Sequence, residues 1–215
     1  MTVGDEGNHI YRIAESEFYE NPAKIFSLDY YTRENGGEDE FSRKQIWFQV
    51  YGDEEIEKEF NKRLTRLFQQ HFNNGDWDFV TMYPTHVKGE VNPHMKKLIE
   101  DIAEDLDLEY SQVLRRNETI EENHELESPR KKIVNVEGTV DITEDVEGKN
   151  VIVVDNIAIS GTSLLHATNR LYEAGAKKVA SVTLGVSKEH REDDMFIEND
   201  ASAKKIMKKT TSEGS

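Results

Sequence analysis

The sequence predicts an α/β fold with a doubly wound, mainly parallel sheet, and three observations support this prediction. Residues 151–154 are four β-branched apolar residues in succession, as in a strand buried on both faces. A helical pattern follows from Leu164, and a second apolar run follows at 179–186. Upstream, residues 78–83 and the helical pattern after Asn92 show the same strand–helix order. Such alternation implies parallel strands joined by right-handed crossovers.

Composition and pattern divide the chain into four segments. Residues 1–9 are polar and acidic, and we expect a disordered start. An N-terminal α+β appendage, or hood, is predicted at 10–75, and the α/β core at 76–187. From residue 188 the chain becomes polar, with paired lysines near its end, so 188–215 is predicted to be a tail.

Within the hood, residues 24–31 have strand character, and a polar, glycine-bearing loop follows at 34–39. The large apolar residues at 46–50 are interpreted as core packing of the hood. The next helix is predicted from apolar residues at helical spacing, with Asn74-Gly75 as its stop. These apolar residues are Ile56, Phe60, Leu64, Leu67, Phe68 and Phe72.

In the core, a strand is predicted at 78–83, and Asn92-Pro93 begins a helix as an N-cap with proline at the first helical position. A second strand is predicted at 108–114, ahead of a strongly charged stretch at 116–132. Gly175 is predicted to cap the last helix. The buried face of the helix after Asn92 is predicted to contain Met95, Leu98, Ile99, Ile102 and Leu106.

The turn after the strand at 151–154 predicts an anion site. Asp155 and Asn156 end the strand, and the small-residue turn 160–163 opens the helical pattern at Leu164. Backbone N–H groups and hydroxyls at a helix N-terminus surround a phosphate, and the helix dipole favours its charge. Asp155 stands at the carboxyl end of its strand, where open α/β sheets bind ligands, and provides a sugar-binding group. The alternative is an ordinary strand–helix turn, in which Ser, Gly and Thr are common.

This segment resembles the phosphoribosyl-pyrophosphate (PRPP) signature of type I phosphoribosyltransferases. That signature consists of an apolar strand, two acids, a short spacer and then Thr/Ser-Thr/Ser-Gly-x-Thr/Ser. The sequence departs from the signature at Asn156, the second acid position, and at Ile159, the first hydroxyl position. The family's acid pair holds the ribose 2′- and 3′-hydroxyls. Asp155 can accept hydrogen bonds from them, whereas Asn156 can accept or donate. The resemblance implies PRPP binding, and the missing charge leaves turnover open.

Upstream residues are similar to the ComF/GntX branch of this superfamily, roughly over 78–187. That branch carries Arg-x-x-x-Thr, Leu-Ser-x-x-x-Arg and Asn-Val-x-Gly-x-Phe segments before the PRPP strand, and an earlier strand that ends in Pro. Asn123 stands near the place of the branch's glutamine, and the chain has no cysteine with which to build the branch's zinc ribbon. The matching landmarks are Pro84, Arg115, Thr119, Leu126, Arg130, Asn135, Val136 and Gly138.

The resemblance implies which residues hold each part of PRPP and its Mg²⁺ ion. Asp155, Asn156 and Lys88 would act at the reacting centre, and Asp155 would meet the metal indirectly, through PRPP. The 5-phosphate would lie on the turn after the PRPP strand, and the pyrophosphate on the loop after the first core strand. The phosphate turn consists of Ile159, Ser160, Gly161, Thr162 and Ser163. The pyrophosphate loop contributes Thr85, His86, Lys88 and Gly89.

The resemblance also implies a flexible loop that closes over the site and excludes water. Arg115, Arg116 and Arg130 flank the charged stretch 116–132, where this loop would lie, and one of them would reach the leaving pyrophosphate. The alternatives are plainer. Lys88 would then be an exposed lysine on a connection, and the arginines would belong to a solvated loop rich in glutamates.

The expected function is phosphoribosyl transfer, a glycosyltransferase reaction of nucleotide metabolism in which a nitrogen nucleophile displaces pyrophosphate from C1 of the ribose. The alternative is a ComF-like sensor or accessory protein that binds PRPP or a nucleotide without turning it over. A flavodoxin-like domain with another phosphate ligand is a third option. The expected ligand is PRPP or a nucleoside monophosphate, and a homodimer is one option for assembly.

Composition argues against several other classes. The net charge of −16 argues against direct binding of duplex nucleic acid. No apolar run reaches transmembrane length and the acidic start is unlike a signal peptide, so we expect a cytoplasmic protein without membrane contact. The sequence contains no His-Glu-x-x-His or Walker motif, which argues against a zinc hydrolase or a Walker-type ATPase. His166 is expected on a helix surface.

Overall fold

The structure is a computed structural model, and it describes residues 9–32, 39–72, 75–126 and 128–188. Nearly all of the predicted disordered start and polar tail, and most of the predicted loop at 34–39, lie outside these ranges. None of the helices in the described ranges is long and apolar enough to cross a membrane.

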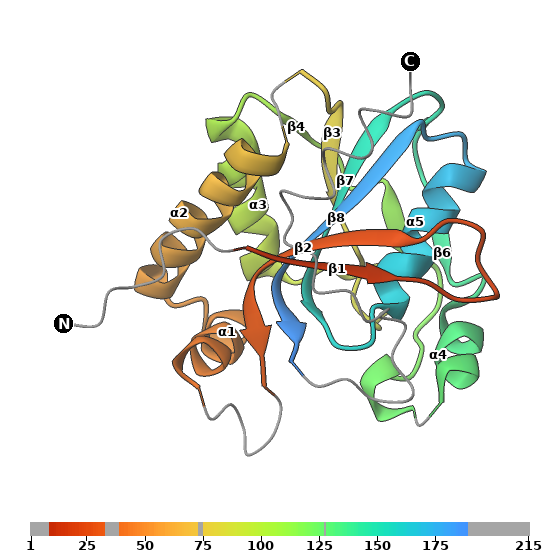
Figure 1. Cartoon of the computed structure of the whole chain (residues 1–215), viewed down its shortest axis with the longest axis horizontal. Helices are drawn as coiled ribbons and strands as arrows, with labels where there is room; N and C mark the ends of the chain where they lie inside the picture. Colours follow the sequence, from red (N-terminus) through yellow and green to blue (C-terminus); the bar gives the residue numbers. More distant parts are fainter. Residues whose placement is uncertain (1–8, 33–38, 73–74, 127, 189–215) are drawn as a thin grey trace.

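A six-stranded sheet forms the centre of the protein (Figure 1). Strand β1 runs antiparallel to β2, and the other neighbouring strands in the sheet are parallel. The predicted α/β fold with a mainly parallel sheet is therefore confirmed. In spatial order the strands are β1 (Ile10–Ala14), β2 (Ala23–Tyr31), β8 (Lys178–Ser187), β7 (Asn150–Ala158), β3 (Phe79–Met82) and β4 (Glu109–Tyr110).

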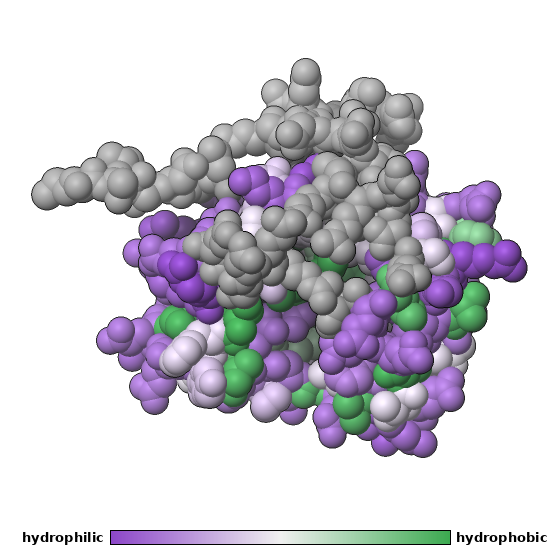
Figure 2. Space-filling view, turned by 90° about the horizontal axis from the view of Figure 1, so that it is seen from below, coloured by the Kyte–Doolittle hydropathy of each residue, from purple (hydrophilic) through white to green (hydrophobic). Residues whose placement is uncertain are grey.

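Helices cover both faces of this sheet. One face carries α1 (Glu40–Tyr51), α2 (Glu54–His71) and α3 (Pro93–Asp105), whereas α5 (Thr162–Glu173) and α4 (Pro129–Val136) lie on the other side (Figure 1). A short 3₁₀ helix, η2 (Asn123–Glu125), precedes α4. The coloured part of the face in Figure 2 is mostly hydrophilic, which agrees with the high content of charged residues.

The central strand β7 explains why the most apolar run of the sequence shows no alternation. Ile152 and Val154 pack in the core on the side of α2 and α3. Val151 and Val153 pack in a second core with α5. Because both faces of the strand are buried, each position from 151 to 154 needs an apolar side chain.

The helix starts and stops follow from local chemistry. Asn92 Oδ1 accepts hydrogen bonds from the N–H groups of His94 and Met95, each at 3.1 Å, and Pro93 takes the first helical position. The predicted N-cap is therefore confirmed. Gly175 follows Ala174, the C-cap residue of α5, and has a φ of +91°, which favours glycine.

The strand predicted at 108–114 is wrong in its extent, because the chain there changes sheets. Strand β4 pairs with β3 for two residues, and the N–H of Val113 then bonds to Ser111 O in a tight turn. The next strand, β5 (Leu114–Arg116), pairs instead with β6 (Val140–Ile142) in a separate antiparallel ribbon. This ribbon holds Arg116, the last residue of β5, in a defined position.

The core packing predicted for 46–50 is correct for Phe48 and wrong for two of its neighbours. Phe48 is fully buried, whereas Trp47 and Val50 are more than half exposed. Helix α1 buries one stripe of residues against the sheet and α2, and this stripe includes Gln45. Gln45 and Gln49 of α1 contact Asn156 near the carboxyl end of β7.

Candidate functional site

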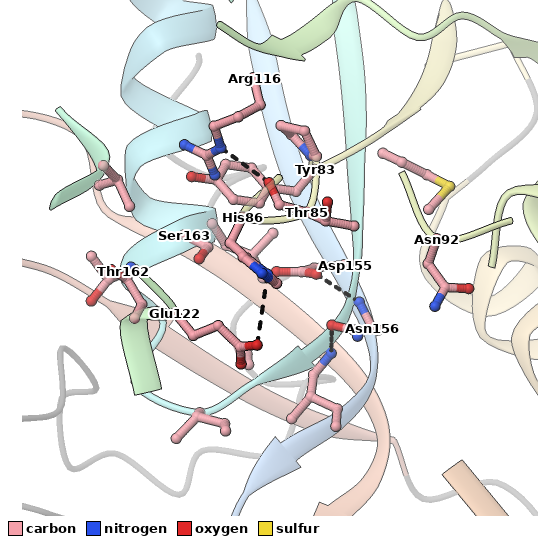
Figure 3. Close-up of a pocket in the computed structure, with 18 of the residues that line it drawn as sticks. Tyr83, Thr85, His86, Asn92, Arg116, Glu122, Asp155, Asn156, Thr162 and Ser163 are labelled. Carbon is pink, nitrogen blue, oxygen red and sulfur yellow. Dashed lines mark hydrogen bonds and ion pairs between the residues drawn. The ribbon is translucent and has the colours of Figure 1, made fainter. Parts of the chain in front are cut away.

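A cavity of about 480 Å³ lies at the carboxyl ends of β3 and β7 (Figure 3). The ends of these two strands and the segments that follow them line it, at 82–87 and 155–164. Other lining residues include Gln49 of α1, Arg116 of β5 and the segment 120–123. The two parallel strands are direct neighbours, so their following segments meet at one edge of the sheet.

The turn after β7 presents the N-terminal end of α5 to this cavity. Gly161 precedes the helix with a φ of +77°, and no side chain caps the helix there. In the described part of the chain, no acceptor is bonded to the N–H groups of Thr162, Ser163 or Leu164. The hydroxyls of Ser160 and Thr162 lie 3.0 Å apart and also line the cavity. This arrangement of uncapped amides, hydroxyls and helix dipole suits an anion such as phosphate.

The strand before this turn is longer than the sequence suggested, because β7 continues to Ala158. Helix α5 begins at Thr162, two residues before the apolar pattern begins. Two hydroxyl residues of the turn, Thr162 and Ser163, therefore lie in the first turn of α5, while Ile159 remains in the connection. All five residues of the predicted phosphate turn line the cavity.

Asp155 lies beside the turn, and its side chain lines the same cavity (Figure 3). Its Oδ1 accepts a hydrogen bond from the N–H of Asn156 at 2.8 Å. Burial raises the pKa of Asp155 to about 7, and the Asn156 N–H and the charge of Arg116 oppose this shift. The carboxyl group is therefore partly protonated at neutral pH and can lose its proton when a cation or a donor arrives.

Asn156 is held by residues that are far away in the sequence. Its Oδ1 accepts from the N–H of Ile157 at 2.7 Å, and its Nδ2 donates to Gln49 Oε1 at 2.9 Å. Gln45 Nε2 donates to the backbone oxygen of Asn156 at 2.7 Å. The contacts of the two glutamines with Asn156 leave no local pattern in the sequence, because they join residues 107 and 111 positions apart.

Arg116 is a buried cation at the cavity, with 2% of its surface exposed. Its Nε donates to the backbone oxygen of Thr85 at 3.0 Å, a second nitrogen donates to Thr139, and the guanidinium lies over the Tyr83 ring at 5.3 Å from the centroid. No carboxylate of the described residues lies within ion-pair distance of it. A buried cation without a counterion favours an anionic ligand.

The flexible loop predicted around the three arginines is wrong for two of them. Arg115 and Arg116 belong to β5, where cross-strand pairing with Asp141 and Val140 fixes the backbone. Arg130 is exposed in the first turn of α4. Arg115 and Arg130 do not line the cavity, so the structure brings one of the three arginines to the site.

The loop after β3 contributes another part of the cavity lining. Thr85 and His86 line the cavity, whereas Lys88 and Gly89 do not, and the Lys88 side chain is exposed. The N–H of Lys88 donates to Thr119 Oγ1 at 3.1 Å, and the N–H of Gly89 donates to the backbone oxygen of Arg116 at 3.0 Å. The backbone N–H groups of these two residues, which were predicted to hold pyrophosphate, are therefore already bonded to the 116–119 segment.

A further contact joins the same two segments at the cavity wall. His86 Nδ1 lies 3.8 Å from Glu122 Oε1, and the two side chains point toward each other in Figure 3. The N–H of Ile120 donates to the backbone oxygen of His86 at 3.0 Å. Since Glu121 and Glu122 both line the cavity, this wall carries negative charge.

The expectation that His166 lies on a helix surface is wrong. His166 is fully buried, and its Nδ1 lies 3.4 Å from the Tyr83 hydroxyl. Burial, assisted by the charges of Arg116 and Arg170, lowers the pKa of His166 to about 3, so the ring is neutral. Helix α5 is covered by the sheet, α4 and the β1–β2 hairpin, which leaves no exposed face at this residue.

The phosphoribosyl transferase domain family matches residues 53–208, which is most of the chain. The protein therefore belongs to the type I phosphoribosyltransferase family, as the PRPP signature implied. No curated protein matches the chain.

Solved structures that match include three proteins of low sequence identity. The allosteric regulatory enzyme of purine biosynthesis is 19% identical, with 65% of this chain and 30% of that chain covered and a TM-score of 0.44. The Bacillus subtilis glutamine PRPP amidotransferase, complexed with ADP and GMP, is 20% identical over 65% of this chain and 30% of that chain, with a TM-score of 0.43. A Bacillus anthracis hypoxanthine-guanine phosphoribosyltransferase is 19% identical over 66% and 73%, with a TM-score of 0.43. The chain thus spans under a third of the first and second of these structures.

Proposed function

We propose that the protein binds PRPP, or a related ribose 5-phosphate compound, with Mg²⁺ and transfers the phosphoribosyl group to a nitrogen acceptor with release of pyrophosphate. One observation carries this proposal. The uncapped start of α5 and the carboxyl group of Asp155 share one cavity, in a chain of the phosphoribosyl transferase domain family.

The 5-phosphate is assigned to the turn after β7. The N–H groups of Thr162, Ser163 and Leu164 would donate to its oxygens, with the Ser160 and Thr162 hydroxyls beside them. Ile159 offers its backbone alone, so the hydroxyl absent at this position removes one donor. Gly161 lets the backbone approach the phosphate without a side chain in the way.

The ribose hydroxyls are assigned to Asp155 and Asn156. The Asp155 carboxylate accepts from hydroxyl groups, and the Asn156 amide supplies a neutral partner in place of the family's second acid. Because Asp155 has a pKa of about 7, a bound ligand that donates to it or brings a cation would draw it into the charged form.

The pyrophosphate is assigned to the other wall of the cavity. Arg116 would supply its buried positive charge, and Thr85 and His86 lie next to it. The amides of Lys88 and Gly89 would contribute after release from Thr119 and Arg116, so we propose that the loop after β3 moves when PRPP binds.

Magnesium fits this arrangement as an ion carried by the ligand. No group of three or more His, Cys, Asp or Glu within the described ranges forms a metal site of its own. Mg²⁺ commonly combines one or two protein carboxylates with phosphate oxygens and water. Asp155 would meet the ion indirectly, through the ribose hydroxyls of PRPP, and the ion would offset charge on the pyrophosphate.

The chemistry requires little from the protein except position and charge. The acceptor nitrogen attacks C1 of the ribose, the bond from C1 to the pyrophosphate oxygen breaks, and pyrophosphate leaves with the electron pair. The proton of the acceptor nitrogen passes to the solvent. Fixed groups hold the phosphate and the sugar, which makes the attack effectively intramolecular. Arg116 stabilises the charge that develops on the leaving group. The N-terminal region at 10–75 is assigned the role of a hood over the acceptor.

A second candidate function has its own structural support. The amides of the loop after β3 are engaged by the protein, and position 156 lacks a carboxylate. A ComF-like sensor or accessory protein, which binds PRPP or a nucleoside monophosphate without turnover, would have both features. Measurement of pyrophosphate release distinguishes the two candidate functions.

The experiment measures PRPP binding by calorimetry with and without Mg²⁺, and pyrophosphate release with a panel of nucleobases and amines. We expect binding that depends on Mg²⁺ and slow release. Asn156→Asp should raise release roughly tenfold, since charge-assisted hydrogen bonds are about twice as strong as neutral ones. Asn61→Asp on α2, away from the cavity, serves as the matched control.

Three outcomes are informative. Absence of PRPP binding contradicts the proposal. Binding without release by either form supports the sensor. Rapid release by the natural protein, with no gain in Asn156→Asp, contradicts the role given to position 156 and leaves an ordinary transferase.

A further inference from the structure

The orientation of two amides in the cavity can be worked out from one obligatory donor. The backbone N–H of Ile157 can only donate, so the Asn156 atom 2.7 Å from it is the oxygen. The Asn156 nitrogen must then face α1. It lies 2.9 Å from Gln49, and the Gln49 atom that receives its hydrogen bond must be Oε1.

This series of hydrogen bonds leaves the side-chain nitrogen of Gln49 without a partner among the described residues. Its Nε2 is buried and bonds to no group in the described part of the chain, although Gln49 lines the cavity. A buried N–H₂ group without an acceptor is destabilising, and native proteins normally satisfy such groups. The group is therefore suited to an acceptor atom that a ligand brings.

Helix α1 holds Gln49 firmly at this place. Gln45, one turn earlier, donates to the backbone oxygen of Asn156 at 2.7 Å. Asn92, the N-cap of α3, donates through Nδ2 to the backbone oxygen of Gln49 at 3.3 Å. Contacts from two directions thus fix the helix turn that carries the unpaired amide.

The position of Gln49 identifies the part of the ligand that meets it. Among the described residues, Gln49 is bonded to Asn156 and has no bond to the phosphate turn. With the 5-phosphate on the turn at 160–163 and the ribose at Asp155 and Asn156, Gln49 would meet the group attached to C1 of the ribose. Met82 and Met95 also line the cavity and offer apolar contact to a planar ring.

We propose that Gln49 is a specificity-determining residue that selects an acceptor bearing a carbonyl oxygen, namely an oxo-substituted nitrogen heterocycle, over its amino-substituted counterpart. This inference rests on the proposed function. A carbonyl oxygen accepts from Gln49 Nε2, whereas an amino group there would place two donors against each other and leave both unpaired.

The test compares nucleoside monophosphates that differ by one oxo or amino group, IMP with AMP and UMP with CMP, by calorimetric titration at pH 8. The natural protein should bind the oxo member of at least one pair roughly tenfold more tightly. Gln49→Glu keeps an oxygen to accept from Asn156 and replaces the unpaired donor with an acceptor. This variant should abolish or reverse the preference.

Two further variants keep the result interpretable. Gln49→Met fills a similar volume without a donor and should bind both members of a pair equally. Gln69→Glu, an exposed position on α2, adds the same charge away from the cavity and should retain the natural preference. A general effect of charge on phosphate binding changes the affinity for both members of a pair equally. The ratio of the two affinities therefore reports only on recognition of the base.

Ribose 5-phosphate, which has no base, separates the failure of this inference from the failure of the proposed function. Equal binding of oxo and amino members by the natural protein, with ribose 5-phosphate bound, overturns the role of Gln49 alone. A loss of ribose 5-phosphate affinity in Gln49→Met as large as the loss for nucleotides also overturns it, because Gln49 would then act through Asn156. If the natural protein binds neither ribose 5-phosphate nor PRPP, the proposed function itself fails.

Discussion

Two neighbouring strands, β3 and β7, end at the same cavity, yet the segments that follow them differ in how their backbone donors are used. After β7, the N–H groups of Thr162, Ser163 and Leu164 have no acceptor in the described structure. After β3, the N–H groups of Lys88 and Gly89 are bonded to the 116–119 segment. The turn after β7 is thus preorganised for an anion, whereas the loop after β3 must exchange protein contacts for ligand contacts.

The charges around the two segments also differ, and they favour an anion more at the turn after β7 than at the loop after β3. The turn after β7 combines a helix dipole with hydroxyl groups. The loop after β3 faces carboxylates, and Glu122 lies 3.8 Å from His86. Arg116 is a buried cation of the cavity and connects to the loop through Thr85. A ligand with one phosphate therefore needs the turn alone, and a ligand with a pyrophosphate needs both sides.

The largest expected effect comes from blocking the preorganised turn. Gly161→Val places a branched side chain where the phosphate approaches and should weaken binding of ribose 5-phosphate and PRPP by more than roughly 100-fold. Gly148→Val is the control for backbone strain, since Gly148 has a similar φ of +69° and open space around it. Calorimetry measures both. Unchanged affinity in folded Gly161→Val would show that the turn is not the phosphate site.

The second prediction concerns the proton on Asp155. Its pKa in the folded protein is about 7, against an ordinary value of 3.8, so the folded state binds more protons than the unfolded state between these values. Stability therefore falls as the pH rises from 4 to 7, since ionisation of a buried carboxyl group is disfavoured. Asp155→Asn should remove this loss and stabilise the protein by about 2–4 kcal/mol at pH 8 relative to the natural chain.

Thermal or urea unfolding of both forms at pH 4 and pH 8 measures this effect. The gain at pH 8 should disappear at pH 4, where the natural carboxyl group is protonated. A difference between the two forms that is the same at both pH values would contradict the raised pKa. The same variant should also bind PRPP more weakly, since it lacks a carboxylate for the ribose hydroxyls.

The smallest expected effect comes from loosening the loop after β3. Thr119→Val removes the acceptor of the Lys88 N–H and should raise the affinity for PRPP about 2–5-fold, because the ligand no longer competes with that hydrogen bond. The affinity for ribose 5-phosphate should stay the same. Equal changes for both ligands would show that Thr119 affects the whole cavity, and a loss specific to PRPP would show that the present loop conformation is the binding one.

The features that the sequence predicted well are those formed by residues close together in the chain. The strand at 151–154, the glycine turn and the start of α5 are consecutive, so the carboxylate and the hydroxyls reach the same cavity as a consequence of local geometry. The Asn92 cap has the same origin, because both of its acceptor contacts are within three residues.

The features that the sequence did not predict depend on contacts between segments far apart in the chain. Arg116 looked like part of a charged loop, and its pairing with β6 buries it at the cavity. His166 looked like a polar residue on a helix surface, and the elements packed around α5 enclose it. The bond between Gln49 and Asn156 joins α1 to the end of β7, and no pattern in either segment indicates it.

The most direct test of the central claim is a titration of the ¹⁵N-labelled protein with ribose 5-phosphate, followed by amide chemical shifts. The amides of residues 161–164 should shift most, because their N–H groups would gain charged acceptors, and the amides of Lys88 and Gly89 should shift little. PRPP with Mg²⁺ should shift both groups. Shifts centred away from the turn after β7, or no shifts at saturating ligand, would contradict the account.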